Sequence, residues 1–232
     1  MIDLAALKRI VSAAALAGLV AGLLLTAVQH IQVIPLILQA EVYEQAAEAK
    51  SHSHAEATAA THHDEEGWTP ADGWERTFFT ALSNVAVALG FALLLGAVMS
   101  LRHGAEGWRA GLQWGAAAYA VFFVAPSLGL PPEVPGTQAA ELSHRQLWWV
   151  LTAVSTAAGL GLIAFARHGA IKLVGAVLLA LPHIIGAPQP QTHASTAPVE
   201  LATAFIVATA IANAVFWLSL GTLVGFFYKK TA

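Results

Sequence analysis

The sequence predicts an all-α fold: a polytopic membrane helical bundle of six transmembrane helices, with the N- and C-termini cytoplasmic. Three observations lead to this prediction. The 232-residue chain is 57% hydrophobic and 11% charged, with a mean hydropathy of +0.64, whereas a soluble domain is about one quarter charged. It contains six apolar segments near the length of about 20 residues that a membrane helix needs. Lysine and arginine also alternate between the predicted inner and outer connections.

The six predicted spans follow one another along the chain. The first comes directly after Lys8 and Arg9, and its apolar run is far longer than the hydrophobic part of a signal peptide, about 7–15 residues. We therefore expect it to be retained as a membrane helix. The fifth is short and contains Pro182, so five spans plus a re-entrant segment is the alternative. The predicted spans are Ile10–Leu38, Phe78–Leu101, Trp108–Leu128, Leu147–Phe165, Leu173–Ala187 and Leu201–Phe227.

The positions of lysine and arginine predict the orientation, because cytoplasmic connections carry an excess of both. With the N-terminus inside, eight of the eleven fall in inner segments and three in outer ones. A five-span arrangement would instead place Lys229 and Lys230 outside. The inner set is Lys8, Arg9, Arg102, Arg109, Arg167, Lys172, Lys229 and Lys230, and the outer set is Lys50, Arg76 and Arg145.

Residues 39–77 form the one long connection in the predicted topology. This segment is rich in Ala, Glu and His, so we expect a mobile exoplasmic loop within a single transmembrane domain of residues 1–232. Imidazole beside carboxylate suits divalent cobalt, nickel or zinc, and the absence of cysteine argues against a Cu(I) site. The pattern predicts a metal-gathering loop, and whether it forms a defined site is left open. Its histidines are His52, His54, His62 and His63.

The exit of the first span combines polar and acidic residues. Gln29, His30 and Gln32 interrupt the apolar run just before it ends, and Glu41 and Glu44 follow Pro35. Amide and imidazole groups are costly inside hydrocarbon unless they find partners or water. This pattern predicts a polar mouth that opens on the outer side of the membrane.

Other polar residues are predicted to lie at a similar depth. Asn84 and His183 fall in the outer third of their spans, and Asn213 falls nearer the middle, at a rise of about 1.5 Å per residue. His144 starts the fourth span, just after Glu133 and Glu141. A proline frees a carbonyl next to His183, and such breaks often build ion sites. The alternative for each of these residues is an ordinary interhelical hydrogen bond.

Several function classes are disfavoured. The chain has no phosphate-binding G-x-x-x-x-G-K-[ST] motif, and therefore no ATP site of that type, and no H-E-x-x-H or G-x-S-x-G motif. We therefore predict that it is not an enzyme. No basic stripe indicates nucleic acid, so the lipid bilayer is the expected surrounding. Paired histidines between helices can ligate b-type haem, which leaves His30 and His183 as a second possible cofactor site.

Several motifs in order resemble the CbtA family of cobalt transporter subunits. They are AGLLLTAVQHIQVIPLILQAEVYE, WTPADGWERTFFTALSNV, APSLGLPPEVPG, RQLWW, LPHIIGAP and FWLSLGTLVGFFY. The resemblance implies a bacterial or archaeal cytoplasmic (inner) membrane protein linked to cobalt uptake for cobalamin synthesis. It also implies a small single-span, His-bearing partner protein (CbtB-like). The residues that the resemblance carries over are Glu41, Glu44, Asp72, Glu75, Arg76, Glu133, Arg145, Gln146 and His183.

Taken together, the sequence predicts a membrane component of a Co²⁺ uptake system that captures the ion at an exoplasmic mouth and conducts it inward. The predicted metal ligands are His183, His30, Glu41, Glu44 and His144, and Ni²⁺ or Zn²⁺ are alternative ions. The alternative function is a non-transporting membrane protein that binds haem or acts as a structural partner. Homo-oligomerisation is left open.

Overall fold

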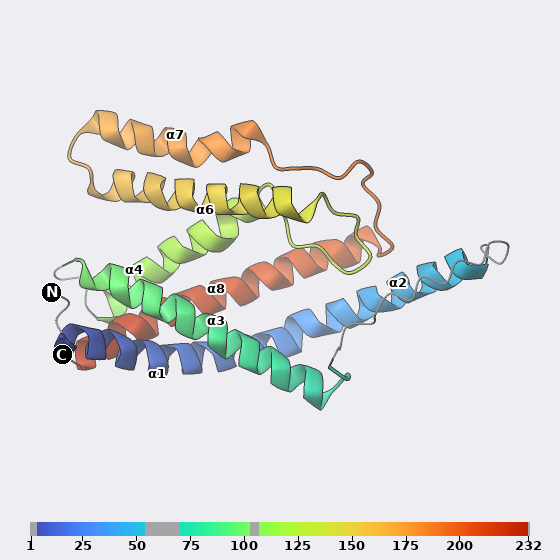
Figure 1. Ribbon diagram of the computed structural model, residues 1–232, viewed down its shortest axis with the longest axis horizontal. Helices are drawn as coiled ribbons and strands as arrows, with labels where there is room; N and C mark the ends of the chain where they lie inside the picture. The colour runs from blue at the N-terminus through green and yellow to red at the C-terminus, as the bar shows by residue number, and fades with distance from the viewer. Residues whose placement is uncertain (1–3, 54–69, 103–106, 232) are drawn as a thin grey trace.

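The protein is a bundle of long helices (Figure 1). The computed structural model describes residues 4–53, 70–102 and 107–231. The start of α1 (Leu4–Val28) and the end of α8 (Val199–Lys230) lie at one end of the bundle, here called the inner end. The far tip of α2 (Ile34–Ser53) projects from the opposite, outer end.

Within the described residues, the helices line up as six long rods (Figure 1). The first runs from α1 through the π-helix η1 (Gln29–Val33) into α2, and the third from α4 (Trp108–Tyr119) through the π-helix η2 (Ala120–Val124) into α5 (Ala125–Ser127). The others are α3 (Trp74–Ser100), α6 (Leu142–Phe165), α7 (Gly169–Ile185) and α8.

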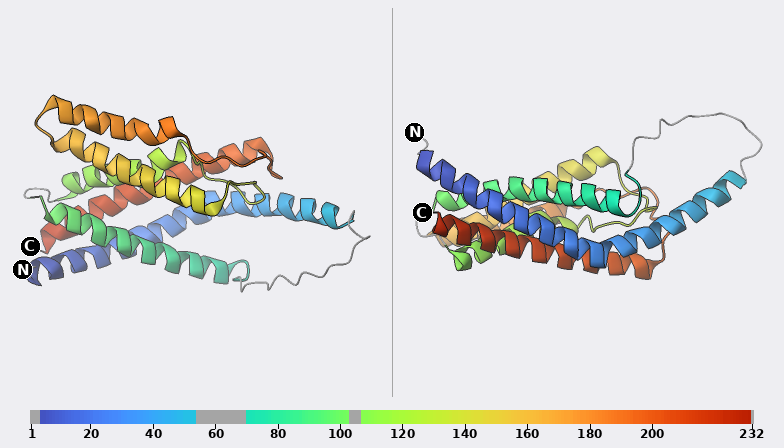
Figure 2. Two further views of the ribbon diagram at one scale, coloured as in Figure 1. Left: turned by 45° about the horizontal axis from the view of Figure 1, so that its top comes forward. Right: turned by 90° about the horizontal axis from the view of Figure 1, so that it is seen from below.

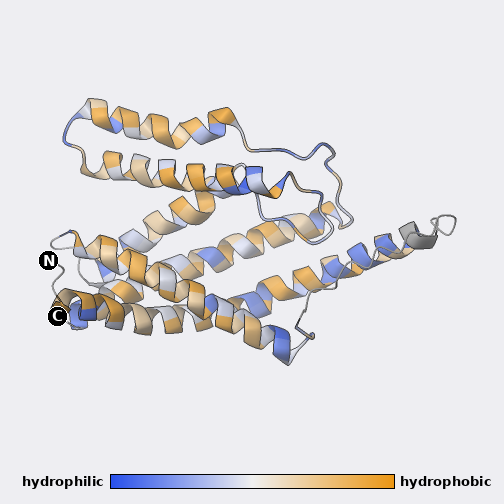
Figure 3. Ribbon diagram, viewed as in Figure 1, coloured by the Kyte–Doolittle hydropathy of each residue, from blue (hydrophilic) through white to orange (hydrophobic). Residues whose placement is uncertain are grey.

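The apolar lengths confirm an all-α membrane bundle. Four of the described helical stretches are long and apolar enough to cross a membrane: Leu4–Lys50, Trp74–Ser100, Leu142–Phe165 and Val199–Lys230. Helix α7 has 17 residues and therefore a length of about 26 Å, slightly less than the hydrocarbon core of about 30 Å. Hydrophobic residues dominate the rods, and hydrophilic ones gather toward the outer part of α2 and the helix ends (Figure 3). The count of six spans and the cytoplasmic termini stay predictions.

Both ends of the predicted connection over residues 39–77 are helical, and its mobile, exoplasmic character stays a prediction. Residues 39–53 continue α2 as helix, and α3 already begins at Trp74. The reason is helix propensity, because the stretch from Ala40 to Lys50 is mostly Ala, Glu, Gln and Lys, which are strong helix formers even outside the membrane. Residues 54–69 lie outside the described part of the chain.

Helices α1, α3 and α8 form the core of the bundle. Helix α1 packs along α3 and α8 through small residues, among which Ala17 and Ala21 are fully buried, as are Ala88 and Ala92 on α3. Small side chains let membrane helices approach closely, and the gain is van der Waals contact rather than a hydrophobic effect. Helix α4 packs mainly on α8, where glycines of each helix lie against the backbone of the other.

Helices α6 and α7 form a separate hairpin beside this core (Figures 1 and 2). They pack on each other at Gly159 and Gly175, where an added Cβ on either glycine would lie 2.7 Å from the other's carbonyl oxygen. The hairpin joins the core through contacts of α6 with η2 and α5. At the inner end, the Arg102 guanidinium lies 3.6 Å from the centroid of the Phe165 ring. The α6–α7 hairpin is therefore attached at a few places rather than along its length.

Both π-helical segments precede a proline at the same spacing. Segment η1 ends at Val33, two residues before Pro35, and η2 ends at Val124, two residues before Pro126. A proline inside a helix lacks an N–H and its ring clashes with the carbonyl four residues earlier. Widening the preceding turn relieves that clash without breaking the rod.

Candidate functional site

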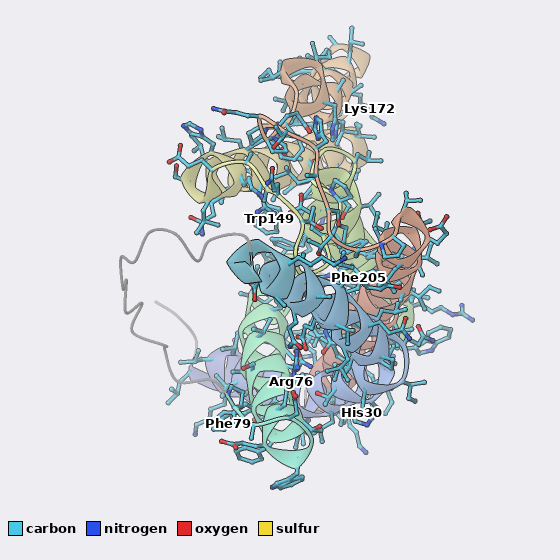
Figure 4. All side chains as sticks on the ribbon, turned by 90° about the vertical axis from the view of Figure 1, so that its right-hand side faces the viewer. His30, Arg76, Phe79, Trp149, Lys172 and Phe205 are labelled. Atoms are coloured by element: carbon cyan, nitrogen blue, oxygen red, sulfur yellow. The ribbon has the colours of Figure 1, made fainter. Side chains whose placement is uncertain are left out.

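An ion-paired cluster joins the outer parts of α2 and α3. The Arg76 guanidinium donates to both carboxylate oxygens of Glu41, at 2.6 and 3.2 Å, and its Nη1 donates to Asp72 at 2.9 Å. The Arg76 and Glu41 side chains are 29% and 28% exposed, whereas Asp72 is 78% exposed. Figure 4 shows Arg76 between the two helices when the bundle is viewed from its outer end. We call Glu41, Asp72 and Arg76 the outer cluster.

The outer cluster continues a run of acidic residues. Glu44 is one helical turn further along α2, and Glu75 precedes Arg76 on α3, where its carboxylate accepts the Ala71 N–H at 3.2 Å. Two of these four carboxylates, Glu41 and Asp72, contact the one guanidinium, and the surplus leaves this end of α2 and α3 negatively charged. A negative field at a helix pair's water-exposed end raises the local concentration of cations.

Two connecting loops pack against the same part of α2. Residues 128–141 and 186–198 pair through an isolated antiparallel bridge between Thr137 and Ser195, and the Thr196 N–H donates to the Gly136 carbonyl at 3.2 Å. Gly136 lies against Glu44, since an added Cβ there would be 3.4 Å from the Glu44 Cβ. Ala40 on α2 is fully buried in this region of the core. The first of these loops therefore packs against α2 at Glu44.

A neutral polar cluster lies deeper between the first rod and α3. Asn84 donates from Nδ2 to Gln29 Oε1 at 2.7 Å and to Thr26 Oγ1 at 3.0 Å. Thr26 in turn donates to the Gly22 carbonyl at 2.9 Å. Asn84 is eight residues beyond Arg76, so the two clusters are about 12 Å apart along α3. We call Thr26, Gln29 and Asn84 the deep cluster.

Close helix packing seals the interface just below the deep cluster. A Cβ added to Gly22 would lie 2.6 Å from the Val85 Cα, and one added to Gly18 would lie 2.8 Å from the Leu89 Cα. Only glycine allows α1 to approach the α3 backbone this closely. The interface between α1 and α3 is therefore tightly packed on the inner side of the deep cluster.

His183 lies in a different part of the bundle from the outer cluster. Its ring meets the edge of Trp148 in a T-shaped contact with centroids 6.0 Å apart. The Trp148 indole N–H donates to the Pro182 carbonyl at 3.3 Å, and the same carbonyl accepts the Gly186 N–H at 3.0 Å. Helix α7 therefore continues through Pro182 to Ile185. In Figure 1, the α6–α7 hairpin and α1 lie on opposite sides of the bundle.

The other predicted histidine ligands are scattered. His30 is exposed on η1, at the edge of the bundle away from α6 and α7 (Figure 4). His144 Nδ1 lies 3.4 Å from Glu141 Oε2, with both side chains about two-thirds exposed at 68% and 67%. His52 falls near the end of α2, where only the backbone is described, and His54, His62 and His63 lie outside the described residues.

The five predicted ligands therefore do not form one metal site. Within residues 4–53, 70–102 and 107–231, no group of three or more His, Cys, Asp or Glu side chains is arranged to hold an ion. His30 and His183 also lie on opposite sides of the bundle, so they do not face each other as a haem pair would. The physical reason is that equal depth in different helices does not imply adjacency, because a bundle has several interfaces at each depth.

Sequence reasoning misses the partners in both clusters. It identifies Arg76 and Glu41 individually, but not their pairing across 35 residues. Gln29, not His30, meets Asn84. The matched depth of Asn84 and the polar exit of the first span is the signal that could find this pair.

A family model described as "Probable cobalt transporter subunit (CbtA)" matches residues 7–229, nearly the whole chain. Neither the comparison with curated proteins nor the comparison with solved structures finds a match.

Proposed function

Since the chain belongs to the CbtA family of probable cobalt transporter subunits, we propose that it captures Co²⁺ at an exoplasmic mouth and conducts the ion inward. It is then the membrane component of a divalent-metal uptake system. The mouth consists of Glu41 and Glu44 on α2. The observation that carries this proposal is the position of the Glu41 carboxylate, held by Arg76 between two membrane-length helices.

In this proposal the Arg76 guanidinium occupies the position of the cargo while the mouth is empty. A carboxylate that is mostly buried needs a positive partner, because an unpaired charge loses more solvation than the protein restores. A hydrated dication is a second suitable partner for Glu41, and Asp72 can retain Arg76 when Glu41 turns to the ion. The exchange leaves neither Glu41 nor Asp72 unpaired at either stage.

The deep cluster then receives the ion further along α3. Asn84 and Gln29 each carry an amide oxygen, a hard ligand that can replace part of a hydration shell. The tight contacts at Gly18 and Gly22 separate this position from the inner side, so passage requires α1 and α3 to move apart. A membrane potential that is negative inside favours inward movement of a dication by about 4.6 kcal/mol per 100 mV.

Further elements of the proposal follow from the family and from the sequence rather than from the described contacts. The chain lies in a bacterial or archaeal cytoplasmic membrane, supplies cobalt for cobalamin synthesis, and works with a small single-span, His-bearing partner. The histidines His52, His54, His62 and His63 gather metal ahead of the mouth. Preference for Co²⁺ over Ni²⁺ or Zn²⁺ is tested by competition in the uptake assay.

The decisive experiment is radioactive cobalt uptake by host cells that carry Glu41→Gln and Glu44→Gln together in the native gene. We expect the concentration for half-maximal uptake to rise at least ten-fold, because both mouth carboxylates are lost. Glu141→Gln is the matched control, since it removes an exposed outer carboxylate next to α6, and it should leave uptake unchanged. If the double variant and the unaltered chain reach half-maximal uptake at the same cobalt concentration, the proposal that Glu41 and Glu44 form the mouth is refuted.

A further inference from the structure

A groove of about 720 Å³ runs between the first rod and the outer half of α8. Gln32 of η1 forms one wall and α8 supplies the rest. Glu200 lies at the outer end of the groove and Ile211 at its inner end, so it extends for about 16 Å along α8. The α8 residues that line it are Val199, Glu200, Thr203, Ala204, Val207, Ala208 and Ile211.

Two polar side chains of this groove lack a partner. Among the described residues, neither the Gln32 side chain nor the Glu200 side chain makes a hydrogen bond or ion pair. Gln32 is nine residues before Glu41 and lies about 14 Å further into the membrane. An amide exposed to hydrocarbon without a partner costs roughly 2–7 kcal/mol. Both residues are exposed, so an amide within the membrane and a carboxylate near its outer edge are available to a polar partner along one groove.

We propose that this groove is the docking site for a single membrane-spanning helix of a second protein. That helix carries a basic side chain opposite Glu200 and a hydrogen-bonding side chain opposite Gln32. Ala204 and Ala208, one turn apart in the groove, allow a helix backbone to come close, as small residues do at membrane helix interfaces. Charge complementarity with Glu200 sets which end of the partner helix lies outside.

Two other occupants satisfy the groove less well. A lipid chain would fill its apolar length but would leave the Gln32 amide unpaired. A second copy of this chain, related by a two-fold axis through the groove, would place one hollow against another and Glu200 near its own symmetry mate. A convex apolar helix with one basic and one hydrogen-bonding side chain meets all three features of the groove: its shape, its amide and its carboxylate.

The test places a photo-crosslinking amino acid at Val207 in host membranes, with Leu82 as the matched control. The two sites are 53% and 55% exposed, and each is eight residues from the start of its helix, on α8 and α3 respectively. We expect Val207 to give a product with a different chain, identified by mass spectrometry as having one membrane span with a basic residue near its outer end. Leu82 should not give this product.

The charge on Glu200 supplies the second measurement. Glu200→Lys in the Val207 probe background should lower the yield of that product at least five-fold, while the amount of chain in the membrane stays the same. A product of twice the chain's mass of 24.2 kDa, lipid-sized adducts alone, or equal yields at Val207 and Leu82 would each overturn the proposal. So would a yield that Glu200→Lys leaves unchanged.

This inference rests on the proposed function only in taking another component of the transporter as the occupant. Crosslinking reports docking and not cobalt movement, so the two proposals fail separately. If the chain crosslinks to its partner but takes up no cobalt, only the proposal of cobalt transport is refuted. If the chain takes up cobalt without this crosslink, only the proposal of docking in the groove is refuted.

Discussion

Arg76 and Glu41 meet through two hydrogen bonds, one at each carboxylate oxygen, across the outer parts of α3 and α2. This bidentate geometry is the strongest arrangement for such a pair. The pair lies near the outer end of α3, beyond which α2 continues alone, so it ties the outer part of α2 to the bundle.

The first prediction separates the structural role of this pair from its role in metal capture. The exchange Glu41→Arg with Arg76→Glu keeps an ion pair at the same place, so we expect the thermal stability in detergent to stay close to that of the unaltered chain. Cobalt uptake should fall at least ten-fold, because the carboxylate has moved from the mouth to α3. Glu41→Gln alone should lower the free energy of unfolding by about 1 kcal/mol. Full uptake by the exchanged chain would show that the pair is only structural.

The second prediction concerns the deep cluster. Asn84→Leu removes two donated hydrogen bonds while keeping a side chain of similar size, so we expect a loss of about 1 kcal/mol in unfolding free energy. Maximal uptake should decrease, whereas the concentration for half-maximal uptake should not, because the mouth is intact. Leu82→Ala, one half-turn away on the exposed face of α3, serves as the control. A change confined to the half-maximal concentration would contradict the order of the two clusters.

The third prediction tests the contact of α4 with α8. An added Cβ on Gly111 would clash with the Gly221 carbonyl oxygen, and the Gly107 N–H already donates to the Gly225 carbonyl at 3.1 Å. We expect Gly111→Ala to destabilise the protein by about 1–3 kcal/mol through overpacking. Gly161→Ala is matched in chemistry and has open space around it, so it should be neutral or slightly stabilising. Thermal unfolding followed by size-exclusion chromatography measures both.

The fourth prediction uses the absence of cysteine from the natural chain. Residues paired across an antiparallel bridge have Cα atoms about 4.5–5.5 Å apart, which is within the range for a disulfide. Thr137→Cys with Ser195→Cys should therefore form a disulfide under mild oxidation, seen as the loss of two free thiols by mass spectrometry. Each single variant should label with a membrane-impermeant reagent in intact cells. Labelling only after the membrane is opened would reverse the predicted orientation.

The fifth prediction concerns His183, whose observed contact is with Trp148. If its role is to fill the space beside that indole, His183→Phe keeps an aromatic edge there and should retain cobalt uptake within about two-fold. His183→Ala should lower stability by about 1 kcal/mol, the order of an aromatic pair. The opposite result, complete loss of uptake in His183→Phe at normal membrane abundance, would restore His183 as a metal ligand.

The fold class could be predicted from the sequence because hydrocarbon imposes helices on apolar segments of this length. The residues at which the helices begin and end were harder to predict. Helix α2 runs to Ser53, although apolarity ends near Leu38, because Ala and Glu maintain a helix in water by propensity alone. Similarly, α6 begins at Leu142 rather than Leu147, because the first residues of this helix are too polar to be predicted as part of a membrane span.

The candidate site was predictable in its residues but not in its partnerships. Glu41 and Arg76 can be identified from the sequence, but which helices adjoin is decided by interhelical packing, which hydropathy does not record. Glycines such as Gly18 and Gly22 bring α1 against α3 and so bring Glu41 to Arg76. Packing also keeps the α6–α7 hairpin, and with it His183, away from the residues that the sequence places at the same depth in the membrane.

The unbroken first rod has a mechanical consequence. From Leu4 to Ser53 it covers 50 residues, about 75 Å or more than twice the hydrocarbon thickness. Its contact with α3 at Gly18 and Gly22 lies within the inner half of the rod, and Ser53 is about 46 Å beyond Gly22. A tilt of the whole rod by roughly 5° about its inner end would move Gly22 by about 2 Å and Ser53 by about 6 Å. The outer tip of α2 thus magnifies any parting of α1 from α3, and a distance probe on Lys50 would read that small motion as a large one.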